Sequence, residues 1–197
     1  MAQNYVLAAT ALLLLPLSAI AQQTWQIDPA HTNAEFSVRH MGISTVRGSF
    51  TKTTGTVQYD PADPSKTAID ATIDVNSIDT RNENRDKDLR SAHFFDVEKY
   101  PTLTFKSKSA QAAGSGKLKV TGDLTLHGVT KEVVLNVDGP SAAIKDPRGN
   151  MHMGASASTV INRSDFGMTG AQAVVGNEIT INIDVEVMQP AQQSAGK

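Results

Sequence analysis

The sequence contains no cysteine, few aromatic residues and almost no excess of charge of either sign. Its 197 residues include 18 Lys and Arg against 20 Asp and Glu, and only 10 Phe, Tyr and Trp. Without cysteine there is no disulfide, thiolate metal site, cysteine nucleophile or lipid-attachment cysteine. Proteins that bind nucleic acids carry a basic face, whereas this chain has a net charge of −2. No nucleic acid is therefore expected as a partner.

Charged side chains are also missing from the first 21 residues, 16 of which are apolar. The apolar run from Val6 to Leu17 is too short to span a hydrocarbon core about 30 Å thick, which needs roughly 20 residues. An A-x-A pattern ends this segment. We therefore predict that residues 1–21 are a cleaved signal peptide and that residues 22–197 form one domain in the periplasm. A retained anchor or a buried N-terminal helix is the alternative.

Strict alternation of apolar and polar residues dominates the rest of the sequence. Residues 69–75 and 179–187 alternate without an error, which is typical of β-strands with one buried face. Shorter alternating runs recur along the chain, and Pro and Gly fall between them, as in an antiparallel meander. The pattern predicts an all-β fold of about eight short strands, arranged as a sandwich or a closed barrel.

One charged segment departs from this alternation. Thr80-x-x-Glu83 matches a helix capping box, and the stretch after it predicts one short helix that stops near Asp96. Asp86 and Asp88 in this segment are expected to be solvated. We expect the helix to cross the barrel or its mouth.

A membrane-spanning barrel would also alternate, with its apolar face toward lipid and an aromatic girdle at each interface. Ten aromatic residues are too few for two girdles, and the C-terminal segment is polar. We therefore expect the apolar face to point inward, without stable membrane insertion. The pattern leaves open whether that interior is filled or hollow.

No motif for catalysis or cofactor binding stands out. The chain has no G-x-S-x-G elbow and no phosphate-binding glycine loop. Its five histidines have no metal-binding spacing, although a barrel could bring His31 and His40 together. We expect neither an enzyme nor a cofactor nor a metal site. A metal-dependent hydrolase, the least favoured alternative, would need three converging histidine or carboxylate ligands.

Seven short motifs follow one another between Trp25 and Gly167. They are WQIDPAH (25–31), FSVRHMG (36–42), VRGSF (46–50), RSAHFFDV (90–97), YPTLTF (100–105), GDLTLHG (122–128) and RSDFG (163–167). In this order they closely resemble the YceI family of exported, lipocalin-like bacterial proteins, from Trp25 to about Val187. The resemblance implies an extended antiparallel lipocalin-like β-barrel of about eight strands with one short helical insertion.

The resemblance also implies an elongated apolar cavity that binds a polyisoprenoid chain, such as an isoprenoid quinone tail or a polyprenyl phosphate. The expected function is a periplasmic carrier or binding protein for such a lipid. A homodimer is compatible with this function. The alternative is a filled barrel that serves as an interaction or stress-response module without a lipid ligand. Micromolar affinity needs a net binding free energy of about −8 kcal/mol, and association itself costs roughly 4–15 kcal/mol. Since each buried methylene contributes about 0.8 kcal/mol, the ligand must bury about 15–30 methylenes, which favours a long chain.

Alternation within the strands indicates which side chains would face such a ligand. The expected lining residues are Phe36, Val38, Phe50, Ile73, Phe105, Leu126 and Ile181. The residues expected to close the ends are Phe94, Phe95, Phe166 and Met168. Candidates for contact with a ligand head group are Arg39, His40 and Arg163. Each lining residue could instead fill a solid core, and Arg163 could instead contact loop carbonyls or form an ion pair.

Overall fold

The computed structural model describes residues 23–191, so the predicted signal peptide lies outside the described residues. The strands are β1 (Gln23–Ile27), β2 (Asn33–His40), β3 (Ser44–Phe50), β4 (Thr53–Tyr59), β5 (Ala68–Asp74), β6 (Ile78–Asp79), β7 (Thr102–Ala112), β8 (Lys117–Leu126), β9 (Val129–Asp138), β10 (Ile144–Lys145), β11 (Met151–Asn162) and β12 (Val175–Gln189). The helices are α1 (Glu83–Arg90) and the short 3-10 helices η1 (Pro64–Lys66), η2 (Val75–Ser77) and η3 (Arg163–Phe166). Among the described residues, no helix is both long enough and apolar enough to cross a membrane.

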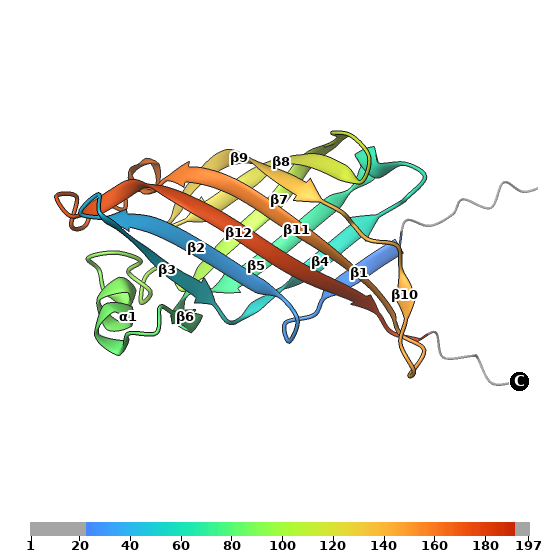
Figure 1. Cartoon of the computed structure of the whole chain (residues 1–197), viewed down its shortest axis with the longest axis horizontal. Coiled ribbons are helices and arrows are strands. Elements are labelled where there is room, and N and C mark those ends of the chain that lie inside the picture. Colours follow the sequence, from blue (N-terminus) through green and yellow to red (C-terminus); the bar gives the residue numbers. More distant parts are fainter. Residues whose placement is uncertain (1–22, 192–197) are drawn as a thin grey trace, which may run out of the picture.

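Eight of the strands close into an antiparallel barrel. Their order around it is β11-β9-β8-β7-β5-β4-β1-β12, and β12 closes the ring by pairing with β11 along residues 151–162. The long strands run obliquely to the long axis of the molecule (Figure 1). The predicted all-β barrel of about eight strands with one short helix is confirmed. At one place in the ring the pairing is short, because β9 joins β11 through residues 136–138 and 156–158.

One edge of β12 pairs with β11, and its opposite edge pairs with two strands, first β2 and then β1. Residues 175–184 pair with β2, and residues 187–188 pair with β1. The turn between β1 and β2, residues 28–32, therefore lies beside β12 at the point where β12 changes partner. There the backbone N–H of Asp28 donates to the carbonyl of Glu186 at 2.9 Å.

Helix α1 lies at the opposite end of the barrel from the chain termini, beside β3 and β6 (Figure 1). It begins two residues after the start that a cap at Thr80 would give. The side-chain oxygen of Asn82 accepts a hydrogen bond from the backbone N–H of Arg85 at 3.0 Å, so Asn82 and not Thr80 is the N-cap residue. The prediction of a capping box at Thr80 is wrong, and the helix ends at Arg90, before the predicted end.

Asp86 is buried rather than solvated, with 6% of its surface exposed. Its carboxylate accepts hydrogen bonds from the backbone N–H of Thr80 at 2.9 Å and from the Thr80 hydroxyl at 2.5 Å. The expectation for Asp86 is therefore wrong, because this side chain fixes the entry into α1 instead of facing water. Asp88 is exposed as expected.

The alternating side chains sort onto the two faces of the barrel wall. On β12, Ile181 and Ile183 face the interior, whereas the alternate residues Asn182 and Asp184 are exposed on the outside. On β11, Ala157, Thr159 and Ile161 face the interior, whereas Val160 and Asn162 are exposed on the outside. The apolar face therefore points inward, as predicted.

Candidate functional site

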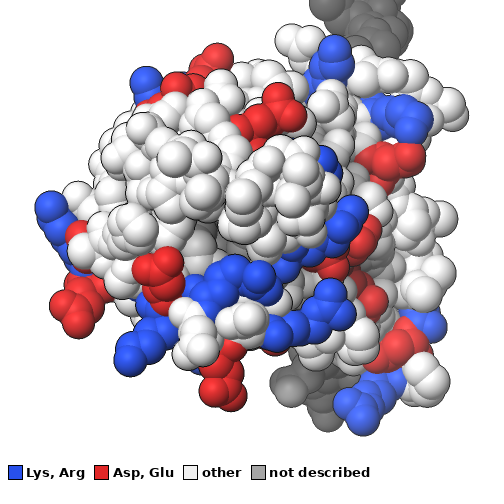
Figure 2. Space-filling view, turned by 60° about the vertical axis from the view of Figure 1, so that its left-hand side comes forward, with Lys and Arg blue, Asp and Glu red and all other residues white. Residues whose placement is uncertain are grey.

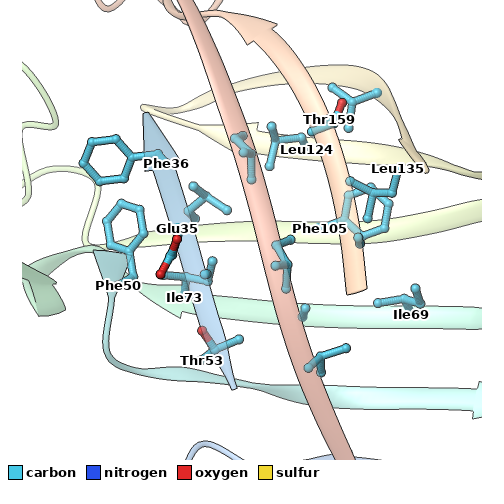
Figure 3. A pocket seen from close by; sticks show the side chains of 18 of the residues that line it. Glu35, Phe36, Phe50, Thr53, Ile69, Ile73, Phe105, Leu124, Leu135 and Thr159 are labelled. Carbon is cyan, nitrogen blue, oxygen red and sulfur yellow. The ribbon is translucent and has the colours of Figure 1, made fainter. Parts of the chain in front are cut away.

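A cavity of about 230 Å³ lies inside the barrel. Its wall is almost entirely aliphatic and aromatic. The side chains around it include Phe36, Phe50, Ile69, Ile73, Phe105, Leu124 and Leu135 (Figure 3). Lining residues range from Phe95, which follows α1 at one end, to Val187 near the end of β12. A small volume distributed between such distant residues describes a long, narrow space.

The interior is hollow rather than filled. Val120 on β8 is fully buried, with 0% of its surface exposed, as expected of a side chain in a solid core. Ile181 and Ile183 face the same interior from the middle of β12 but are only half-buried. Because these two side chains point away from bulk solvent, the surface that they expose is the wall of the cavity.

Small side chains account for much of this space. Ala157 on β11 lies opposite Ile183, and Ala71 on β5 lies opposite Phe105. Both alanines line the cavity. A close-packed interior would need larger side chains at these positions, since protein cores normally leave few voids larger than a water molecule.

Aromatic rings gather at the end of the cavity beside α1. The ring centroids of Phe36 and Phe50 are 5.7 Å apart, and those of Phe50 and Phe95 are also 5.7 Å apart in an edge-to-face arrangement. Phe95 is placed by its backbone N–H, which donates to the carbonyl of Leu89 at the end of α1. The segment after the helix thus closes this end of the barrel with apolar side chains.

Apart from Arg39 and Arg163, twelve residues are candidate ligand contacts, and ten of these twelve line the cavity. They are Phe36, Val38, Phe50, Ile73, Phe94, Phe95, Phe105, Leu126, Met168 and Ile181. The other two are not among the lining residues: His40 is the last residue of β2, and Phe166 is packed in η3 with 2% exposure. Contact with a ligand stays a prediction for all twelve.

The two arginines proposed as head-group contacts already have protein partners. The guanidinium of Arg163 is buried and donates to the carbonyls of Gly176, Met168 and Val175 at 2.9, 2.8 and 3.0 Å. Burial lowers the pKa of Arg163. Arg39 is exposed and donates to the carbonyl of Gly42 and to a threonine hydroxyl. These contacts agree with the alternative of loop carbonyls for Arg163, and a head-group role for either arginine stays a prediction.

Sequence reasoning missed the threonines of the lining. Thr32, Thr53, Thr67 and Thr159 all contribute to the wall, and the hydroxyl of Thr53 is buried without a hydrogen-bond partner. Alternation assigns apolar residues to the inward face and polar residues to the outward face, so it predicts an outward position for a threonine. Alternation within the strands does indicate other lining residues that were not among the candidates, such as Leu118 on β8 and Leu135 on β9.

The outer surface at the α1 end combines uncharged and charged areas. Figure 2 shows Lys and Arg side chains gathered with some acidic ones beside a large uncharged surface. Three apolar side chains are exposed on turns: Met41 and Ile43 between β2 and β3, and Val174 before β12. The backbone N–H of Met41 donates to the carbonyl of Val174 at 2.7 Å, which joins the two turns.

Known proteins are similar to this chain in sequence and in fold. A family model described as the YceI-like domain matches residues 25–187. A UPF0312 protein of Vibrio cholerae is 38% identical over 175 residues, which cover 87% of this chain and 92% of that protein. The crystal structure of BcnA from Burkholderia cenocepacia matches with a TM-score of 0.72 and 26% identity, over 81% of this chain and 98% of that one.

A third match is a structure of a polyisoprenoid binding domain from Saccharophagus degradans. It aligns with a TM-score of 0.63 over 84% of this chain and 98% of that one. At 17% identity this likeness concerns the fold alone. The family model, in contrast, matches nearly all the described residues, and its match begins and ends at the positions that the sequence motifs indicate. The chain therefore belongs to the YceI family.

Proposed function

We propose that this protein binds a long isoprenoid chain, of the isoprenoid quinone or polyprenyl phosphate type, inside the barrel and carries it in the periplasm. The observation that carries the proposal is the unfilled apolar interior, in which Ile181 and Ile183 remain half-buried. The fold shared with a polyisoprenoid binding domain from Saccharophagus degradans supports the same ligand class.

The shape of the cavity favours a slender chain over a compact molecule. Its volume of about 230 Å³ is below the roughly 300–1,000 Å³ of typical small-molecule sites. The lining nevertheless extends from Phe95 to Val187, along most of the barrel. A linear chain gains contact area along the whole of this length, and each methylene removed from water contributes about 0.8 kcal/mol.

We propose a binding protein rather than an enzyme, because the charged side chains of the described lining are already engaged. Glu35 lies between the inward residues Ala34 and Phe36, and its carboxylate accepts a hydrogen bond from Asn33 at 2.7 Å. The donors of Arg163 are directed at backbone carbonyls. The wall therefore offers shape and apolar area, and no cofactor other than the bound lipid is proposed.

Native mass spectrometry of the protein purified from a bacterial periplasm tests this proposal. We expect a bound species that organic solvent extracts and that fragments at intervals of one isoprene unit. Protein that is free of lipid, and that also fails to bind an added long-chain quinone, would show the proposal to be wrong.

A further inference from the structure

Two histidines and three carboxylates gather on the outside of the barrel, around the point where β12 changes partner. Asp28 and His31 lie in the turn between β1 and β2, and Glu186 lies on β12. His152 on β11 and Asp146 in the turn before it complete the group. The next residues along these strands, Ile27, Met153 and Val187, line the cavity, so the group faces away from it.

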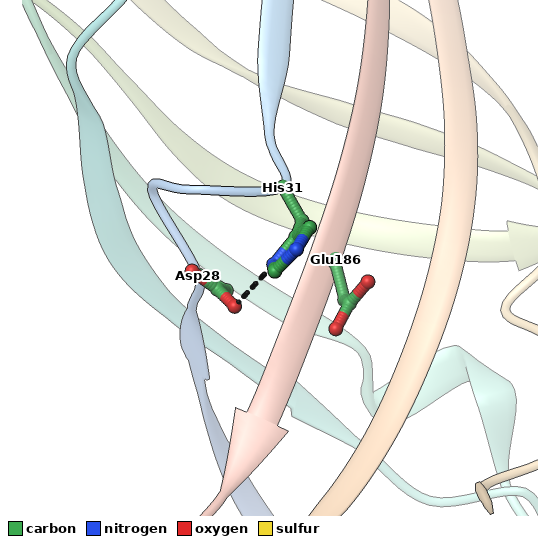
Figure 4. A group of neighbouring side chains, drawn as sticks. All are labelled: Asp28, His31 and Glu186. Atoms are coloured by element: carbon green, nitrogen blue, oxygen red, sulfur yellow. Dashed lines mark hydrogen bonds and ion pairs between the residues drawn. The ribbon is translucent and has the colours of Figure 1, made fainter.

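Three side chains of this group converge on one point. One potential ligand atom from each of Asp28, His31 and Glu186 lies within 4.8 Å of the other two. Figure 4 shows the imidazole of His31 close to both carboxylates, with Nδ1 of His31 at 2.9 Å from Oδ2 of Asp28. An ion at the centre of the three atoms is at most about 2.8 Å from each, so side-chain shifts of less than about 1 Å reach the bond lengths of roughly 2.0–2.2 Å for zinc.

Neighbouring groups hold the two carboxylates in place. Nδ1 of His152 lies 2.7 Å from Oε1 of Glu186, and Nε2 of the same ring lies 3.3 Å from Oδ2 of Asp146. The other oxygen of Asp28 accepts a hydrogen bond from the backbone N–H of Ala30 at 2.9 Å. Metal-binding residues are characteristically oriented by such outer hydrogen bonds.

The group also carries negative charge that no nearby lysine or arginine balances. Within residues 23–191, the ion pairs of Asp28, Asp146 and Glu186 are made with His31 and His152 alone. The hydrogen bond to Asp28 raises the pKa of His31, and those to Glu186 and Asp146 raise the pKa of His152. The surroundings thus favour a positive charge at the place where the three ligand atoms meet.

We infer that Asp28, His31 and Glu186 bind one divalent transition-metal ion of the zinc class, with water completing its coordination. A neutral imidazole nitrogen with two carboxylate oxygens suits Zn²⁺ and its neighbours in the first transition series. Ca²⁺ and Mg²⁺ prefer sites made of oxygen ligands alone. The spacing of histidines in the sequence does not predict this site. Glu186 is far from Asp28 and His31 in the sequence, and only the closed barrel brings it beside their turn.

The ion would have a structural effect at this position. It joins the β1–β2 turn to β12 where one edge of β12 passes from β2 to β1. The backbone hydrogen bond from Asp28 to Glu186 already joins these elements, and a shared metal ion adds a link between their side chains. An ion that binds the folded chain and not the unfolded chain therefore stabilises the barrel by mass action.

Isothermal titration of tag-free protein with ZnCl₂, after treatment with a chelator, tests the site. We expect one ion per chain for the wild type and at least about a 10-fold loss of affinity in His31→Ala and in Glu186→Gln. Glu186→Gln keeps the size of the side chain, so it serves if His31→Ala fails to fold. Circular dichroism of each metal-free variant verifies the fold.

A matched control lies elsewhere on the surface. His93 is also exposed and also pairs with an aspartate, Asp88, at 3.3 Å, but these two residues are not part of the three-ligand group. His93→Ala should bind Zn²⁺ as the wild type does. Absence of stoichiometric Zn²⁺ in the wild type, or equal affinity in the wild type, His31→Ala and Glu186→Gln, overturns the inference.

Discussion

Ala157 on β11 lies directly opposite Ile183 on β12, and both side chains face the cavity. The methyl group of the alanine leaves open the space that a larger side chain would occupy at the seam where the barrel closes. Ile183 beside it is half-buried. The pair therefore identifies a place where a bound chain and the protein compete for the same volume.

Filling this space should block the ligand. Ala157→Phe is expected to reduce the affinity for a long-chain quinone by at least about 10-fold, because a displaced segment of two or three methylenes contributes roughly 2 kcal/mol. Fluorescence or calorimetric titration measures the change. Val160→Phe is the control, since Val160 is on the same strand, faces outward and is 55% exposed. Equal binding by the two variants would contradict a ligand in the barrel interior.

Affinity should also depend on the length of the chain. Each added methylene that enters the cavity is expected to strengthen binding about 4-fold, as follows from roughly 0.8 kcal/mol per methylene. The increase should stop when the space between Phe95 and Val187 is filled. A competition series of quinones with the same head group and increasing numbers of isoprene units measures this dependence. A flat series would show that the head group, and not the chain, dominates binding.

Arg163 is predicted to stabilise the fold. Replacing it with Met leaves the carbonyls of Gly176, Met168 and Val175 without their donor. Each buried group left unsatisfied costs about 1–3 kcal/mol, so the free energy of unfolding should fall by at least about 2 kcal/mol. Urea denaturation measures this, with the exposed Arg39→Met as a control. A loss of lipid affinity at unchanged stability would assign Arg163 to the head group instead.

The sequence predicts the barrel well because alternation is a local property of each strand. The run from Ile179 to Val187 shows its inward face directly, and most lining residues follow from the same rule. Contacts that depend on closure have no such signal. His31 lies in the turn before β2 and His40 is the last residue of β2, so the length of the strand, on the order of 23 Å for seven steps of about 3.3 Å, separates them. The idea that the barrel brings them together is therefore wrong, and His31 meets Glu186 instead.

The burial of a polar side chain is the second feature that the sequence does not predict. Asp86 has the sequence context of an exposed helical residue, yet it binds Thr80 in the interior of the turn. Propensity and local charge favour solvation at such a position. The packing of the segment before α1 against β3 decides otherwise, and that packing is a property of the complete fold.

The Asp86–Thr80 contact should hold α1 in place. Asp86→Ala leaves the backbone N–H of Thr80 buried without an acceptor, and we expect the free energy of unfolding to fall by about 1–3 kcal/mol. Hydrogen exchange should increase first in residues 80–90, next to the aromatic end of the cavity. Asp88→Ala is the control, because Asp88 is 55% exposed. Equal effects of the two substitutions would show that the buried contact has no special weight.

Metal binding and proton binding should oppose each other at His31 and His152. Hydrogen bonds that the rings donate to neighbouring carboxylates raise the pKa of each ring above its unfolded value, which is near 6.5. In metal-free protein their contribution to stability is therefore complete below about pH 6.5 and is lost as the pH rises through the folded pKa. The variant with His31→Gln and His152→Gln should lose this component of the pH dependence.

Zn²⁺ should reverse the trend, because only a deprotonated imidazole coordinates the ion. The increase in Tm caused by Zn²⁺ is expected to be small near about pH 5.5 and to grow toward about pH 8, as His31 loses its proton. Thermal denaturation with and without Zn²⁺ at several pH values measures both effects. A Zn²⁺-induced shift that is the same at all pH values, or that persists in His31→Gln, would show that the ion stabilises the chain without His31.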